Sequence, residues 1–330
     1  MELNSKNSND VELVENLNSS VKKIKSEIGK MIIGQEDIVQ NLLVSIFAGG
    51  HSLLVGVPGL AKTLLIKTLA DVLDLKFSRI QFTPDLMPGD ITGTEIIEED
   101  QITKKRSFRF IEGPVFANII LADEINRTPP KTQSALLEAM QEHKVTAMGK
   151  TYDLDEPFFV LATQNPIEHE GTYPLPEAQL DRFMFNIWLD YPKYEEEIQI
   201  VKLTTSDYKP HLEEVISKNE LIEFQKLVRR VPIADNVIEY AVKKVKQSRH
   251  DEENSSQLNE WINWGAGPRA SQYLVIAAKT KAIMDGRFTP SIDDIKESLI
   301  PVLRHRIIPN FHAEAEGITS LDIIAKLSED

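Results

Sequence analysis

Short apolar runs alternate with helix-like patterns from about residue 52 to residue 190. Three of the apolar runs are almost continuously hydrophobic, which is typical of parallel strands covered on both faces. Residues 61–74 and 128–143 lie between such runs and carry apolar side chains at helical spacing. The alternation predicts an α/β fold with a parallel sheet. The expected strands are 52–55, 79–82, 118–122, 158–162 and 185–189.

The pattern changes after Tyr191-Pro192, where strand-like runs become scarce. Helical spacing then dominates, so we expect the α/β core to end near residue 190 and residues 191–330 to form a smaller, all-helical domain. The expected helices are 194–206, 218–229, 234–248, 268–285 and 291–303.

The N-terminal region has a mixed character. Residues 1–20 are polar and rich in Asn and Ser, and we expect them to form a flexible segment ahead of a core that begins at residue 21. From about Val11 to Lys30, however, apolar residues recur every three or four positions, as on an amphipathic helix.

Composition narrows the function classes. The chain has 330 residues, with 37 basic and 51 acidic side chains and a net charge of −14. Nucleic-acid binding depends on Lys and Arg that neutralise phosphates, so a general DNA or RNA binder is disfavoured. No apolar run approaches the roughly 20 residues of a membrane span, and the N-terminus lacks the pattern of a secretory signal. Cysteine is absent, which excludes disulfides and thiolate metal sites. We expect a cytoplasmic protein.

Residues 56–63 read GVPGLAKT and stand between an expected strand and an expected helix. They match the phosphate-binding pattern G-x-x-x-x-G-K-[S/T] except at Ala61, which replaces the second glycine and which we expect to adopt right-handed helical angles. Lys62 would supply a charge for the β and γ phosphates of ATP, and Thr63 a hydroxyl for Mg2+. A Gly/Pro turn with a chance Lys-Thr is the alternative. The ATP-binding candidates here are Gly56, Val57, Pro58, Gly59, Leu60, Ala61, Lys62, Thr63 and Leu64.

Two carboxylates, Asp123 and Glu124, end the apolar run at 118–122. Asp123 could hold Mg2+, partly through water, and Glu124 could act as the general base on an attacking water. Asn165 follows the next strand and could orient that water by hydrogen bonds. For Asp123 and Glu124 the alternative is a strand that runs out into a polar turn. For Asn165 it is an ordinary Asn-Pro turn.

Two arginines are further candidates. Arg182 stands just before the last expected strand, where it could neutralise the transferring γ-phosphoryl group or form a salt bridge with Asp181 or Glu177. Arg269 follows Pro268, which suits the first position of a helix. An arginine in the positive first turn is unfavourable unless an anion is near, which points to a functional role.

With these motifs assembled, the chain resembles the MoxR family of AAA+ ATPases from about residue 21 to residue 327. The phosphate loop with Ala at its sixth position looks like the MoxR form. The motifs that carry the resemblance are GVPGLAKT (56–63), LADEINR (121–127), ALLEAMQE (135–142), ATQNP (162–166), EGTYPLPEAQLDRF (170–183) and PVLRHRI (301–307).

The resemblance implies a P-loop αβα core with a five-stranded parallel sheet, a helical lid and a ring of subunits, usually six, that share active sites. It makes Lys62 and Thr63 Walker A residues, Asp123 and Glu124 Walker B, and Asn165 sensor 1. It makes Arg182 the finger that reaches a neighbouring subunit and Arg269 the lid's sensor 2. It also places Ile33 and Gly34 against adenine, and inserts at 83–110 and 144–157.

Members of this family act as chaperone-like ATPases on client proteins, often with partners that carry von Willebrand factor A domains. The leading hypothesis is therefore a ring ATPase that remodels protein complexes. A DNA-acting AAA+ motor and a nucleotide-gated scaffold with little turnover remain as alternatives. His305 and Arg306 match a family-typical stretch, but the sequence provides no role for them.

Overall fold

The computed structural model describes residues 2–99, 106–147, 149–167, 171–208, 210–249 and 257–329. At its centre is a five-stranded sheet in the order β2-β5-β8-β1-β9, and every neighbouring pair is parallel. The five strands expected from the sequence are the five strands of this sheet, with ends shifted by no more than two residues. They are β1 (Ser52–Gly56), β2 (Phe77–Gln81), β5 (Ile119–Asp123), β8 (Phe159–Gln164) and β9 (Phe185–Leu189).

Helices cover both faces of the sheet. Because successive side chains of a strand point to opposite faces, Leu54 packs with one hydrophobic cluster and Leu53 and Val55 with another. The first cluster includes buried residues of α1 (Glu2–Gly29), α2 (Glu36–Ala48) and α3 (Lys62–Val72), and the second those of α5 (Pro130–Glu142). The α/β prediction is confirmed as an αβα sandwich.

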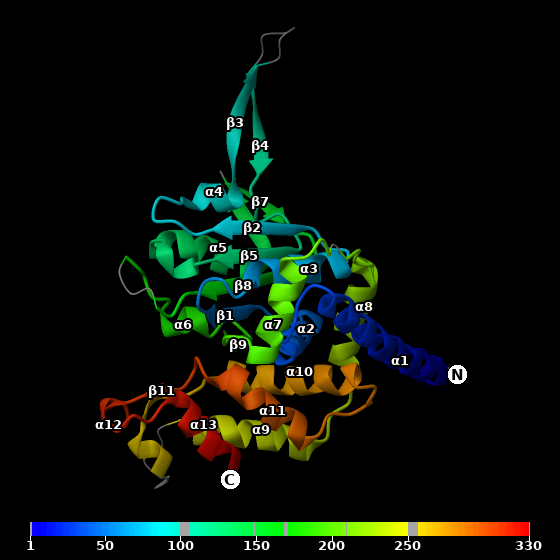
Figure 1. Cartoon of the computed structure of the whole chain (residues 1–330), viewed down its shortest axis with the longest axis vertical. Coiled ribbons are helices and arrows are strands. Elements are labelled where there is room, and N and C mark those ends of the chain that lie inside the picture. Colours follow the sequence, from blue (N-terminus) through cyan, green and yellow to red (C-terminus); the bar gives the residue numbers. More distant parts are fainter. Residues whose placement is uncertain are drawn as a thin grey trace.

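The helices from residue 235 onward gather beside one end of the core, below the sheet in Figure 1, whereas the two helices before them lie alongside the core. Buried residues of α8 to α11 and α13 belong to the same cluster as those of α1 and α2, so this domain packs firmly on the core. The helices are α7 (Tyr194–Thr204), α8 (Lys218–Arg230), α9 (Asp235–Gln247), α10 (Pro268–Met284), α11 (Ile292–Leu303), α12 (Phe311–Ala315) and α13 (Ser320–Glu329).

The expectation that this domain is all-helical is wrong in one detail. β10 (Ile262–Trp264) and β11 (Ile308–Pro309) form an antiparallel pair between helices. Runs of three and two residues are too short to show a period of two, so the sequence pattern could not reveal them.

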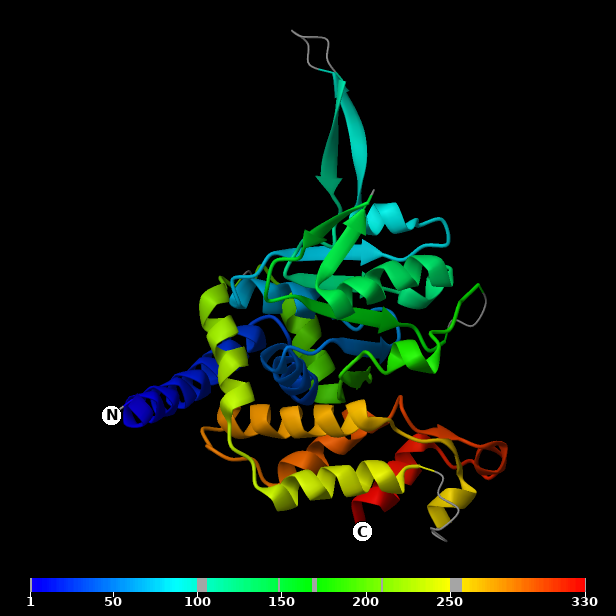
Figure 2. The same ribbon diagram turned by 180° about the vertical axis from the view of Figure 1, so that it is seen from behind.

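Two hairpins occupy the two insert regions. β3 (Gly93–Glu99) and β4 (Arg106–Glu112) follow the short α4 (Pro88–Thr92) and project from the core in both views (Figures 1 and 2). Residues 100–105 lie outside the described ranges. The second hairpin is formed by β6 (Lys144–Ala147) and β7 (Lys150–Asp153). The rings of Phe110 and Tyr152 stack with centroids 4.2 Å apart and so join the two hairpins at their bases.

Helix α1 crosses the boundary that the sequence analysis placed at residue 20. It is continuous from Glu2 to Gly29, and Val14 and Leu17 on it are buried in the main hydrophobic cluster. Asn18 donates a side-chain hydrogen bond to the carbonyl of Met284 at 2.6 Å. The amphipathic spacing therefore predicted the structure of this region correctly, whereas the polar composition did not. No helix in the described ranges is both long and apolar enough to cross a bilayer.

Leu17→Ala should lower the free energy of unfolding by about 2–5 kcal/mol, because it removes a fully buried side chain and leaves a cavity. Val11→Ala on the same helix is the control. Val11 is 42% exposed, so its truncation should stay within about 0.5 kcal/mol of wild type. Denaturant unfolding measures both changes. Equal, small effects would mean that α1 does not contribute to the folded body.

Candidate functional site

Three adjacent strands bring the candidate residues to one edge of the sheet. β5, β8 and β1 are neighbours and parallel, so their carboxyl ends meet at the same edge. Asp123 ends β5, Asn165 follows β8, and the loop that leads to Lys62 follows β1. Burial lowers the pKa of Lys62, and the charges of Asp123 and Glu124 act on it in the opposite direction. The loop cation and the two carboxylates therefore interact across this edge.

The two glycines of the loop serve different needs. Gly59 has a φ of +87°, in the left-handed region, and a Cβ there would meet no heavy atom within 4 Å. Gly56 instead stands against β9, where a Cβ would lie 2.8 Å from the Cβ of Leu189. Close packing between strands therefore explains the glycine at position 56, and backbone conformation explains the glycine at position 59.

Ala61 contradicts the expected geometry. It has φ 55° and ψ 24°, which is left-handed, and it caps the N-terminus of α3. This conformation costs an L-residue other than glycine roughly 1–2 kcal/mol, and it explains why the phosphate-binding pattern prefers glycine here. Strained backbone of this kind clusters at ligand-binding loops.

The start of α3 suits an anion. Its first turn begins at Lys62 and contains no acidic residue, and the first N–H groups of a helix have no partner within the helix. Lys62 Nζ folds back to donate to the carbonyl of Gly56, which closes the loop. Leu60 is buried and anchors the loop, while Pro58 is exposed. The residues fit a phosphate group and its cation.

Asp123 is held by two side chains. Thr163 Oγ1 donates to Oδ1 at 2.6 Å, and Arg79 Nη2 lies 2.7 Å from Oδ2. The hydroxyl of Thr163 also accepts a hydrogen bond from the backbone N–H of Glu124 at 2.9 Å. Thr163 was not among the site residues predicted from the sequence, although it lies within the ATQNP motif, two residues before Asn165.

Glu124 follows in a left-handed conformation with φ 58°. Its Oε2 accepts from Gln81 Nε2 at 2.9 Å and from Arg127 Nη1 at 3.0 Å. Neither donor was predicted from the sequence, because no motif indicates that Gln81 or Arg127 contacts Glu124. The two hydrogen bonds fix the direction of the carboxylate.

Asn165 is 7% exposed, and its Oδ1 accepts a hydrogen bond from the backbone of Ile167 at 3.2 Å. The Asn-Pro turn that was left open as an alternative is therefore present. The turn keeps Asn165 at the end of β8, between the strand that carries Asp123 and the strand that leads into the loop.

Arg182 lies on another surface. Its Nη1 donates to the carbonyl of Leu137 at 2.7 Å, and the residue lines a cavity of about 270 Å³ between α5 and α6 (Glu177–Leu180). No residue of the loop 56–64 lines that cavity. Asp181, one of the expected salt-bridge partners of Arg182, is instead paired with Arg269 and Arg306 at 3.0 and 2.7 Å.

The anion expected beside Arg269 is thus a side chain of the protein. Asp181 approaches from the core and compensates an arginine that stands in the first turn of α10. Arg269 does stand in the positively polarised first turn of a helix, as the sequence indicated, and the carboxylate of Asp181 compensates its charge.

Ile33 and Gly34 lie beside a different cavity. It has a volume of about 540 Å³, is lined by residues of α1, α2, α7 and the connection between α1 and α2, and has no residue of 56–64 in its lining. Gly34 has a φ of +69°, and a Cβ there would lie 2.7 Å from the carboxyl carbon of Glu196 on α7. The contact of these residues with adenine stays a prediction.

The chain matches known proteins over most of its length. Residues 51–185 match the ATPase family associated with various cellular activities (AAA), and residues 256–327 match the AAA lid domain. Chaperone MoxR1 of Mycobacterium tuberculosis is 42% identical over 302 residues, which are 91% of this chain and 79% of that protein. YeaC, an uncharacterised protein of Bacillus subtilis, is 42% identical over 314 residues, 95% and 94% of the two chains. The crystal structure of a proposed ATPase from Cytophaga hutchinsonii agrees with a TM-score of 0.90 at 44% identity, over 100% of this chain and 98% of that one.

Thr163→Val keeps the shape of the side chain but removes the hydroxyl that joins Asp123 to the backbone of Glu124. The N–H of Glu124 loses this partner, so the free energy of unfolding should fall by about 1–3 kcal/mol. ATP hydrolysis should fall as well, because both carboxylates lose their alignment. Thr163→Ser retains the hydroxyl and should stay near wild type in both assays. A Val variant that hydrolyses ATP as fast as the Ser variant would contradict this role.

Proposed function

Since the chain belongs to the MoxR family of AAA+ ATPases, we propose that it hydrolyses ATP to drive the remodelling or maturation of protein complexes. One observation carries the proposal. The loop that ends at Lys62 follows β1 and the carboxylates of Asp123 and Glu124 follow from β5, and the order and parallel direction of β5, β8 and β1 bring both to the same edge. This arrangement combines a phosphate-binding loop with a pair of carboxylates at one sheet edge.

In this proposal the backbone N–H groups of the loop and Lys62 bind the phosphates of ATP. The hydroxyl of Thr63 and the carboxylate of Asp123 would hold Mg2+, which neutralises charge on phosphate oxygens when it is bound. Arg79 already pairs with Oδ2 of Asp123, so it would share this carboxylate with the cation.

Glu124 would accept a proton from the attacking water, and Asn165 would orient that water. Gln81 and Arg127 both donate a hydrogen bond to Oε2 of Glu124. These hydrogen bonds hold the carboxylate in one direction, which reduces the reorganisation required for proton transfer.

We extend the proposal to a homo-oligomeric ring, with six subunits as the expected size. Arg182 lines a cavity that none of the loop residues shares, which favours action on the site of a neighbouring subunit. The name of the mycobacterial relative favours a protein client over the DNA-acting alternative. A cytoplasmic location and a partner with a von Willebrand factor A domain stay predictions.

Lys62→Ala should abolish ATP binding, because it removes the cation that attracts the phosphates. Glu124→Gln should retain ATP binding and slow hydrolysis by about 10²–10⁴-fold, the usual contribution of a general base. Binding of a fluorescent ATP analogue and release of inorganic phosphate measure the two properties. Hydrolysis at the wild-type rate by Glu124→Gln would refute the assignment of the base.

Arg182→Ala should slow hydrolysis by about 10³–10⁵-fold if the arginine stabilises the transferring phosphoryl group. Mixing this inactive protein with inactive Glu124→Gln protein should restore phosphate release, because the second protein can supply Arg182 to sites of the first. Each interface in a ring is head-to-tail, so each site receives Arg182 from one neighbour only. In a random one-to-one mixture, about a quarter of all sites therefore combine an intact Glu124 with an intact Arg182 from the neighbour. A mixture as inactive as its components would contradict shared sites.

A further inference from the structure

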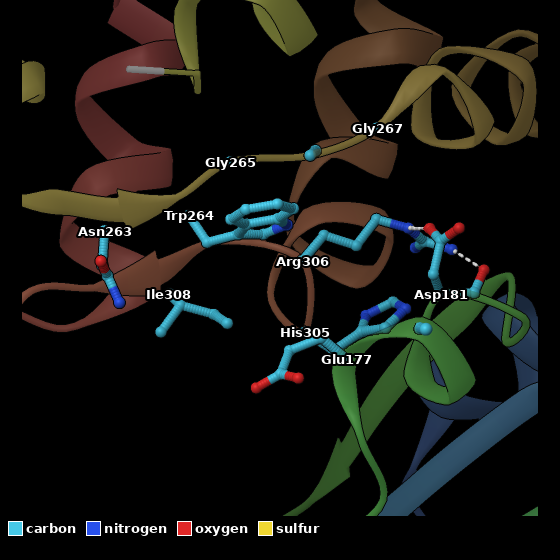
Figure 3. Close-up of a pocket in the computed structure, with 11 residues that line it drawn as sticks. Glu177, Asp181, Asn263, Trp264, Gly265, Gly267, His305, Arg306 and Ile308 are labelled. Atoms are coloured by element: carbon cyan, nitrogen blue, oxygen red, sulfur yellow. Dashed lines mark hydrogen bonds and ion pairs between the residues drawn. The ribbon is translucent and has the colours of Figure 1, made fainter.

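A buried arginine of the lid, Arg306, forms hydrogen bonds to the segment that carries Arg182. Arg306 is 5% exposed and extends from the end of α11 toward the core, where Figure 3 shows it meeting Asp181. A guanidinium group has five N–H donors in a planar fork, and Arg306 uses all five. Nε donates to Asp181 Oδ1, and the other four donors reach the carbonyls of Asp181, Phe183, Met184 and Val302.

Two further lid side chains bind the same stretch of backbone. Tyr273 on α10 donates its hydroxyl to the carbonyl of Arg182 at 3.1 Å, and His305 Nε2 lies 3.1 Å from the carbonyl of Phe183. Burial raises the pKa of Tyr273, so the phenol is protonated and can donate. Burial also lowers the pKa of His305 well below its usual range, which keeps the ring neutral. All four consecutive carbonyls from residue 181 to residue 184 thus accept hydrogen bonds from the lid.

A cavity of about 510 Å³ lies beside these contacts, between α6 of the core and the β10–α10 connection of the lid. Asp181, His305 and Arg306 form part of its wall, together with Trp264, which is 65% exposed. Met184 of this segment also packs in the main hydrophobic cluster with Val302 and Leu303 of the lid. The polar contacts to residues 181–184 add direction to this packing, because each one fixes a particular carbonyl.

We propose that the lid positions Arg182 for the active site of the neighbouring subunit, through the hydrogen bonds of Arg306 and Tyr273. The inference rests on the proposed function, since it assumes that Arg182 acts across a subunit interface. Arg306 and Tyr273 are positioning residues, because they contact the backbone around Arg182 and not the reacting groups. Asp181 extends the connection to Arg269, which pairs with its second carboxylate oxygen.

The role can be separated from any effect within one subunit by placing the substitutions in a donor protein. The donor carries Glu124→Gln, so its own site is inactive and it contributes only Arg182. The acceptor carries Arg182→Ala and depends on the donor for its finger. Phosphate release by the mixture then reports how well the donor presents Arg182.

Adding Arg306→Lys to the donor should reduce this restored activity by about 100-fold, the cost of displacing a catalytic group by roughly 1 Å. Lysine keeps the charge but has three donors in place of five and cannot reproduce the fork. The loss should appear in kcat of the acceptor site and not in its KM for ATP. Arg304→Lys in the donor is the matched control. Arg304 lies two residues before Arg306 in the sequence, and its guanidinium group stacks on the ring of Trp188.

Tyr273→Phe in the donor is the milder variant and keeps the apolar ring in place. It removes only the hydroxyl bond to Arg182 and should lower the restored kcat in the same direction. Size-exclusion chromatography and thermal unfolding establish that each donor folds and assembles.

Folded Arg306→Lys and Tyr273→Phe donors that restore activity as well as the Arg304→Lys donor would overturn the inference and leave the shared site intact. If Arg306→Lys does not fold, Tyr273→Phe decides alone by the same criterion. If the unmodified Glu124→Gln donor fails to restore activity, the shared site itself is refuted, and the inference falls with it.

Discussion

The candidate site depends on one constraint, the parallel alignment of three adjacent strands. Because β5, β8 and β1 run in the same direction side by side, the residues that follow them must meet at one edge of the sheet. Lys62 arrives there from β1 and the two carboxylates from β5, and their charges already influence one another. Lys62 and Asp123 are far apart in the sequence, and the order of the strands brings them together. A different strand order would separate them.

The site also depends on polar contacts around the two carboxylates. Thr163 connects the side chain of Asp123 to the backbone of Glu124, and the donors on Glu124 come from Gln81 and Arg127. These contacts join β2, β5 and β8 at the same edge. Pairing of this kind holds reactive carboxylates in fixed directions before any substrate arrives, which is the physical basis of preorganisation.

Much of the fold was predictable, because each element has a local signature. The apolar runs located all five strands of the sheet, and the motif 56–63 located the loop at the start of α3. Backbone conformation was less accessible: the left-handed angles of Ala61 depend on how the loop enters α3, not on the propensity of alanine. The pair β10–β11 was missed because its strands are too short to show a period.

The sequence could not assign contacts that join distant segments. Asp181 looked like a partner for Arg182, but the lid brings Arg269 and Arg306 to it from 88 and 125 positions away. Nothing in the local pattern around Arg306 indicates that its five donors converge on the segment 181–184. Such contacts follow only from the packing of the lid on the core, which also explains why the family-typical stretch that contains His305 and Arg306 had no role at the level of sequence.

The most direct test of the central claim is a structure of the Glu124→Gln protein assembled with ATP and Mg2+. We expect a triphosphate within hydrogen-bond distance of the N–H groups of 59–63, with the metal between Thr63 and Asp123. The central claim would be contradicted by a nucleotide bound away from this loop, or by a metal that Asp123 does not approach even through water.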